Sequence, residues 1–410
     1  MTDAPTASRR GDPALLVLGL AGTGFNLSGA LGTLALTLVA LFEGDSEAAS
    51  LGTWASGSLI AMAVAGIPAI VLGLRGVLGR APSAPLRPAA AWIPASIALA
   101  FPIALLAGAS SLTRPDLRLV AISVHIATAV LPVAFAVLLV QIPGPASTFR
   151  RLWGQFMLGL WGMPIVAIVF EVLALVPVAV VTVAGLASSV DVRRMVEPLL
   201  QGTPVPGLSS YETVLRLLLH PWVLVCLFGF VSGLVPLIEE AVKSLAVLPI
   251  AHRLRPSEAF MGGALGGAGY ALFEALFLTQ PNPSWVTTMI GRGGATLMHA
   301  FTAAITCWGI SQVATGRRRW GRLALAFLTS VVMHGTWNAA VIGLGIVQVN
   351  QEIGALGLPE ALASLVVYGA PILLAALSLI ALVGLPFGAL RLRQADELRR
   401  GPASVGGLPG

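Results

Sequence analysis

The sequence predicts an all-α protein, a polytopic bundle of about ten transmembrane helices, and three observations support that prediction. Of the 410 residues, 56% are hydrophobic and only 10% are charged, whereas a soluble globular protein carries about 25% charged residues. The apolar residues gather in runs of about 20 residues or more, the length that crosses the core of a bilayer. The arginines stand in short clusters between these runs. That placement encodes topology, so the net charge of +6 points to no nucleic-acid partner.

Ten segments qualify as spanning helices. The first follows Arg9 and Arg10 and is too long for the apolar core of a signal peptide, so we expect a retained helix. The fifth and sixth are long enough to tilt or bend, and prolines inside them are tolerated where neighbouring helices satisfy the backbone. In chain order the expected segments are 16–42, 54–74, 89–110, 119–141, 156–185, 222–249, 259–279, 287–311, 323–347 and 363–388.

The distribution of arginine predicts the orientation of the chain. With the N-terminus in the cytoplasm, the inner segments carry 17 arginines and the outer segments carry five. Positively charged residues prefer the cytoplasmic side of a membrane. The sequence therefore predicts a multi-pass protein of the cell membrane whose N-terminus and C-terminus are both cytoplasmic.

The positions of the polar motifs divide the chain into four regions. Residues 1–155 form an N-terminal transmembrane region of four helices, and residues 156–221 hold the fifth helix and an extracytoplasmic loop. Residues 222–347 contain the motifs described next, and residues 348–410 form the last helix and a cytoplasmic tail. We expect the chemistry of the protein to lie in the third region.

Ionisable residues stand inside four successive spans of that region. A charged side chain at the centre of a spanning helix costs roughly 2.5–3.5 kcal/mol on insertion scales. These groups should therefore face one another or a water-filled cavity rather than lipid. They are Glu239, Glu240 and Lys243 in the sixth span, Glu274 in the seventh, Arg292 and His299 in the eighth, and His334 and Asn338 in the ninth.

The depth of these residues predicts a shared site. Depth is counted from each predicted cytoplasmic helix end at about 1.5 Å per residue. The hydrocarbon core is about 30 Å thick, so residues near its middle on different helices can meet. Residues from four different spans lie between about 14 and 22 Å deep on this count, namely Glu240, His334, His299 and Glu274.

These residue types suit hydrolysis by either of two routes. In the first, Glu239 or Glu240 takes a proton from water while a histidine or Asn338 stabilises the developing oxyanion. The sequence has no HExxH motif, the usual zinc signature on a helix. It also has no serine nucleophile elbow and no cysteine nucleophile motif, which disfavours covalent catalysis. In the second route Zn²⁺ leaves one position open for water, and its ligands are Glu274, His299 and His334.

The count of charges favours the first route. Three acids, Glu239, Glu240 and Glu274, stand against Lys243 and Arg292, which leaves a formal charge of −1. That is a weak attraction for a dication, and fixed cations beside the acids repel Zn²⁺. We therefore expect catalysis to need the two histidines but no tightly bound metal, with Zn²⁺ the candidate cofactor if there is one.

Four motifs follow one another in this region, each on its own predicted helix. They are Glu239-Glu240-x-x-Lys243, Gly-Tyr270-Ala-x-x-Glu274, Arg292 ahead of His299-Ala-Phe-Thr, and His334-Gly-x-x-Asn338. The first is weak alone, but the four in this order resemble the PrsW family of intramembrane proteases. More distantly they resemble the CAAX prenyl endopeptidases and the bacteriocin-immunity-type membrane proteases. The resemblance covers about residues 235–345, and Ala275 stands where many members have asparagine.

The resemblance implies hydrolysis of a peptide bond within the membrane, with a membrane protein as substrate, and makes residues 222–347 a PrsW-like protease core. The best-known substrate in Gram-positive bacteria is a membrane-bound anti-sigma factor. By the family pattern Glu239 and Glu240 supply the carboxylate that activates water. His299 and His334 position the water or stabilise the oxyanion, and the supporting residues are Lys243, Glu274, Arg292 and Asn338.

Two other classes of function stay open from the sequence. A proton- or ion-coupled transporter also buries acids, histidines and a lysine. Such a protein usually shows inverted repeats or paired broken helices, and this sequence shows neither. A non-catalytic PrsW-like scaffold would keep the same pocket without the activity.

Overall fold

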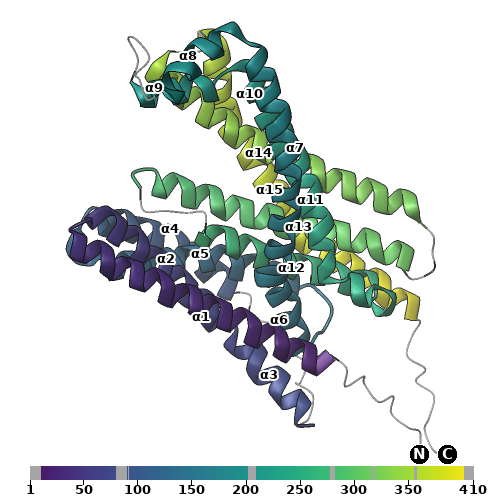
Figure 1. Ribbon diagram of the computed structural model, residues 1–410. Coiled ribbons are helices and arrows are strands. Elements are labelled where there is room, and N and C mark those ends of the chain that lie inside the picture. The colour runs from purple at the N-terminus through teal and green to yellow at the C-terminus, as the bar shows by residue number, and fades with distance from the viewer. Residues whose placement is uncertain are drawn as a thin grey trace, which may run out of the picture. The chain divides into compact units, whose positions relative to one another are not determined.

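The computed structural model describes residues 11–79, 90, 92–201, 209–277, 282–314, 316, 319–354 and 358–400 (Figure 1). Within these ranges the regular structure is entirely helical, which confirms the all-α fold. The α-helices are α1 (Gly11–Glu43), α2 (Ser46–Ala65), α3 (Ile67–Val77), α4 (Trp92–Leu112), α5 (Arg118–Gln141), α6 (Phe149–Met157), α7 (Met163–Ser188), α8 (Val190–Leu200), α9 (Ser210–Leu218), α10 (Pro221–Phe228), α11 (Val235–Lys243), α12 (Pro256–Phe277), α13 (Trp285–Ala314), α14 (Trp320–Ile353) and α15 (Glu360–Arg400). Between them lie the 3₁₀ turns η1 (Pro115–Leu117), η4 (Ser244–Ala246) and η5 (Leu248–Arg253) and the π-helical turns η2 (Leu158–Gly162) and η3 (Gly229–Leu234).

Nine helical segments of the described residues are long and apolar enough to cross a membrane, and they coincide with nine of the ten expected spans. The remaining expected span, 287–311, lies in α13, a helix of 30 residues that is not among these nine. Its composition is less apolar because it carries Arg292, His299 and several threonines. The chain is thus a multi-pass membrane protein, and the orientation of its termini stays a prediction.

The chain forms two compact units. The first combines Met1–Pro164, Lys243–Phe327 and Ile380–Gly410, and the second combines Ile165–Val242 and Leu328–Leu379. The boundary falls inside α7, α11, α14 and α15, between consecutive residues of a continuous helix. The sequence-based division into four regions follows the motifs instead and stays a prediction.

α12 is the central helix of the first unit. It is buried along nearly its whole length and packs against α13, α5 and α6. Glycine at the contact positions permits this close packing. A Cβ atom on Gly263 would overlap the carbonyl oxygen of Ala303 in α13, and one on Gly269 would overlap that of Phe156 in α6. In the same unit α1 lies alongside α2 and α3 (Figure 1).

Hydrogen bonds from α6 and α15 hold the first turn of α12. Asp396 of α15 accepts a bond of 3.0 Å from the backbone N–H of Ser257, one of the N–H groups that a helix start leaves without an intrahelical partner. Glu258 accepts bonds from Arg151 at 2.9 Å and from Arg255 at 3.1 Å. The hydrogen bond to Glu258 raises the pKa of Arg255. This end of α12 is therefore fixed in position by charged partners.

In the second unit α7 pairs with α10. The indole N–H of Trp222 donates a hydrogen bond of 3.2 Å to the carbonyl of Val181, and a Cβ atom on Gly185 would overlap the same indole. α9 begins with a capping box between Ser209 and Glu212. The hydrogen bonds from Ser209 lower the pKa of the Glu212 carboxyl, so this cap is strongest when the carboxyl is ionised.

Candidate active site

α11 carries three buried charged residues among its nine. It follows the π-helical turn η3 and gives way to the 3₁₀ turn η4, and π turns inside helices occur frequently at functional sites. Glu239 is 5% exposed, and Glu240 and Lys243 are fully buried. The boundary between the units follows Val242, so the two glutamates belong to the second unit and Lys243 belongs to the first. None of the three side chains is exposed at the surface, as the sequence predicts.

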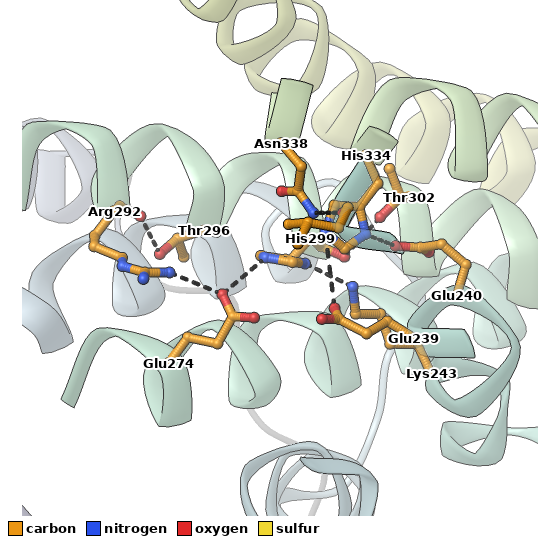
Figure 2. A network of polar contacts seen from close by, with 11 residues as sticks. Glu239, Glu240, Lys243, Glu274, Arg292, Thr296, His299, Thr302, His334 and Asn338 are labelled. Carbon is orange, nitrogen blue, oxygen red and sulfur yellow. Dashed lines mark hydrogen bonds and ion pairs between the residues drawn. The ribbon is translucent and has the colours of Figure 1, made fainter. Parts of the chain in front are cut away.

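In the first unit a chain of hydrogen bonds links four of the predicted site residues (Figure 2). The ammonium nitrogen of Lys243 lies 2.6 Å from Nδ1 of His299. Nε2 of the same ring lies 3.1 Å from the carboxylate of Glu274, which also accepts a bond of 3.0 Å from Arg292. The ammonium lies 4.8 Å from the centre of the Tyr270 ring, a cation–π distance. We call these five residues the α13 cluster.

The chemistry of the donors indicates where the hydrogens lie in this chain. An ammonium group only donates, so Lys243 donates and Nδ1 of His299 accepts. In a neutral imidazole the other nitrogen then carries the hydrogen, and the Nε2–H group donates to Glu274. Along these hydrogen bonds the cation Lys243 is followed by the neutral ring of His299, and then by the anion Glu274 and the cation Arg292. Both ring nitrogens of His299 are therefore engaged.

Backbone packing holds His299 against α12. A Cβ atom on Gly267 would overlap the carbonyl oxygen of His299, so glycine at this position lets α13 approach. The side chain of His299 is almost fully buried, and its ring centre lies 5.8 Å from that of Tyr270. The thiol of Cys307, on the same helix, lies 3.9 Å from the carbonyl oxygen of Lys243. Together these contacts bring α12, α13 and the end of α11 to one point of the first unit.

In the second unit the imidazole of His334 faces both glutamates of α11. Its Nδ1 lies 3.0 Å from the carboxylate of Glu240, and its Nε2 lies 3.8 Å from that of Glu239. The first distance is a hydrogen bond and the second is longer than one. All three side chains are buried. With Asn338 they make up what we call the α14 cluster.

Asn338 holds α14 against the turn η3. Its amide nitrogen donates a hydrogen bond of 2.8 Å to the carbonyl of Val231, within the π-helical segment. A Cβ atom on Gly335 would overlap the carbonyl oxygen of Ser232, so the approach of the two backbones requires glycine. The amide nitrogen of Asn338 is thus engaged by the backbone of η3, on the same helix that carries His334.

Each of the eight candidate residues thus lies in one of the two clusters. The contact of Lys243 with His299 joins residues 56 positions apart, and no spacing in the sequence marked it. The spacing of Glu239, Glu240 and Lys243 puts all three on one face of a helix, so spacing alone makes the glutamates the neighbours of Lys243. That the two clusters converge in one cavity stays a prediction.

Comparison with known proteins supplies a family for part of the chain. Residues 208–375 match a family model described as PrsW family intramembrane metalloprotease. The matched range contains all eight candidate residues and the whole of α10 to α14, and it confirms the resemblance that the motifs indicate. No curated protein and no solved structure matches the chain. Helices α1 to α8 lie outside the matched range.

Proposed function

We propose that this chain, which carries a PrsW-family segment over residues 208–375, is an intramembrane endopeptidase that hydrolyses a peptide bond of a membrane protein. One observation supports the proposal most directly. The single imidazole of His334 faces two adjacent, buried carboxylates, those of Glu239 and Glu240. Carboxylate and imidazole groups within hydrogen-bond reach of a water are the usual components of general acid–base catalysis.

The unequal distances to His334 suggest different roles for the two glutamates. Glu240 accepts a hydrogen bond from Nδ1, which orients the ring and fixes its tautomer. Glu239 lies 3.8 Å from Nε2, and a substrate water can contact both of these groups. Glu239 takes a proton from that water as the oxygen attacks the peptide carbonyl. The proton then passes to the leaving nitrogen as the C–N bond breaks.

The α13 cluster supplies positive charge for the same reaction. Lys243 follows Glu239 by four residues on α11, and side chains at that spacing are neighbours, about 5–6 Å apart at Cβ. The helix itself therefore connects the two clusters, and we propose that both face one cavity. There the Lys243 ammonium stabilises the oxyanion that forms on the peptide carbonyl, while Glu274 and Arg292 hold His299 in its orientation.

Binding of a metal ion by Glu239, His299 and His334 would require breaking a hydrogen bond of His299. Glu239, His299 and His334 are of the types that bind a metal ion, and the matched family is described as a metalloprotease. Catalytic zinc usually has three protein ligands. Both ring nitrogens of His299 are engaged by other side chains, so ligation would break one of these bonds. We therefore keep the proposal that a glutamate activates the water and that no tightly bound metal is needed.

Proteomics of the membrane fraction tests the proposed function. Cells with the wild-type protein are compared with cells carrying Glu239→Gln, and Glu360→Gln, an exposed carboxylate at the start of α15, is the matched control. We expect one or more membrane proteins to accumulate uncut only with Glu239→Gln, and to be cut by the purified wild-type protein in liposomes. Cleavage that is unchanged by Glu239→Gln would reject the proposal. A more specific substrate, an anti-sigma-type regulator, is suggested by the family resemblance alone.

A further inference from the structure

The first unit contains a second feature of chemical interest, a cavity among helices that lie mostly outside the matched range. Its volume is about 330 Å³, which is at the lower end of small-molecule sites, about 300–1,000 Å³. α1 contributes Thr33 to its wall, α2 contributes Trp54, Ala55 and Ser58, and the last turn of α12 contributes Leu276 and Phe277. All three helices belong to the same unit.

One hydroxyl group in the wall of this cavity is unusual. Ser58 is 3% exposed, yet its oxygen has no hydrogen-bond partner within the described part of the chain. Neighbouring hydroxyls on these helices donate to their own backbone: Thr53 to Ala49 at 2.7 Å and Ser56 to Gly52 at 2.8 Å. A buried hydroxyl without a partner is destabilising, because it has lost its hydrogen bonds to water. Ser58 is therefore a hydrogen-bond donor in the wall of the cavity that the described residues leave unused.

The surroundings of the cavity restrict the ligand to one class. α1, α2 and α12 are all long and apolar enough to span a membrane, so a molecule that enters from between them comes from the bilayer. No charged side chain of the described residues lines the cavity, which disfavours an ionised ligand, because an unpaired charge is costly in such a site. The walls are mainly apolar, and the large side chains are Leu51, Trp54, Leu59, Leu276 and Phe277.

We infer that this cavity binds a neutral, membrane-soluble molecule with an apolar chain and one hydrogen-bond acceptor, of the kind found in an acyl ester or amide. The chain packs against Trp54 and Phe277, and the carbonyl oxygen accepts from Ser58. The binding site stands independently of the proposed function. A consequence that rests on the proposed function is that the occupant supports the last turns of α12, which also carry Glu274 of the α13 cluster.

The test compares two probes that differ only around the acceptor. Thermal unfolding of the full-length protein in detergent is measured with methyl laurate, which has an ester carbonyl, and with dodecane, which has none. We expect methyl laurate to raise the unfolding midpoint more than dodecane does. Ser58→Ala should remove that difference, and Ala55→Phe, which fills the cavity, should remove both shifts. Ile60→Phe, at an exposed position of α2, is the matched control and should keep them.

A second measurement covers the case in which a variant folds poorly. A fatty acid methyl ester with a diazirine on its chain is photo-crosslinked to the wild-type protein, and the labelled peptides are mapped. Labels on residues 51–59 of α2 and on the end of α12, competed by methyl laurate, are the expected result. Equal shifts with ester and alkane in the wild type, or labels spread over the lipid-facing helices without competition, would overturn the inference.

Discussion

The contacts of His334 make the two neighbouring glutamates chemically distinct. Glu240 is fully buried and bonded to Nδ1 at 3.0 Å, whereas Glu239 keeps a small exposed fraction and lies 3.8 Å from Nε2. A glutamine at 240 can still accept the bond from Nδ1 through its amide oxygen. A glutamine at 239 cannot act as a base. The two positions should therefore respond differently to the same substitution.

We predict that Glu239→Gln lowers the rate of cleavage by about 10²–10⁴-fold. Glu240→Gln should lose only about tenfold, because a charge-assisted hydrogen bond is about twice as strong as the neutral bond that replaces it. The measurement is kcat/KM on a reconstituted substrate, with thermal unfolding of both variants as the control for folding. Equal losses would argue that both carboxylates act as one unit.

A prediction on metal content follows from the donors of His299. Since Lys243 and Glu274 engage both ring nitrogens, we predict that the purified protein holds less than stoichiometric zinc and keeps its activity in phenanthroline. His299→Gln should lower activity without changing the metal content found by elemental analysis. Stoichiometric zinc, with activity lost on chelation and restored by added Zn²⁺, would reverse this prediction and make the histidines ligands.

At the scale of single elements, α12 acts as the support on which α13 is placed. Glycines at 263 and 267 allow the backbone of α13 to lie directly against α12, and α12 also carries Tyr270 and Glu274, which contact His299 from the same side. The position of His299 is therefore set by backbone packing as well as by its hydrogen bonds. A side chain added at this contact should displace α13.

We predict that Gly267→Ala destabilises the protein by about 1–3 kcal/mol, the usual range for an overpacked core, and lowers activity with it. The matched control is Gly291→Ala on α13, where an added Cβ atom meets nothing within 4 Å. Alanine is favoured over glycine in a helix by roughly 0.5–1 kcal/mol, so the control should be neutral or stabilising. Unfolding in detergent measures both effects. A Gly267→Ala protein as stable as Gly291→Ala would contradict the role given to this contact.

The sequence predicted the helices better than it predicted their interruptions. Long apolar runs predict membrane-spanning helices where the chain faces lipid. The same pattern predicted α13, although its polar residues lower its mean hydropathy. The π-helical turns η2 and η3 left no signal, since their residues are as apolar as those of the flanking helices. The bond between Lys243 and His299 was likewise hidden. Spacing along one helix shows which of its residues share a face. It does not show which residue of a neighbouring helix will contact them.

At the scale of the whole molecule, the candidate residues are divided between the two compact units. The chain crosses between the units four times, in α7, α11, α14 and α15, and one crossing separates Glu240 from Lys243 by three residues of a single helix. Glu239, Glu240 and His334 carry two acids and one imidazole. The α13 cluster carries two cations and one acid. The two clusters carry formal charges of opposite sign, which agrees with the shared cavity that we propose.

We predict that this convergence is detectable as proximity of His299 and His334 in the membrane-embedded protein. Each histidine is replaced by cysteine in a Cys226→Ser, Cys307→Ser background, and a short bifunctional thiol reagent is applied to the double variant. An intramolecular crosslink is expected in the double variant alone, and the two single variants are the controls. The reason is physical: α11 is too short to separate Glu239 from Lys243 by more than about one turn, so their partners must lie near the same stretch of helix. A separation of the two histidines beyond about 15 Å, wider than a pocket of about 1,000 Å³, would exclude a shared site and leave His334 with the two glutamates as the reactive group.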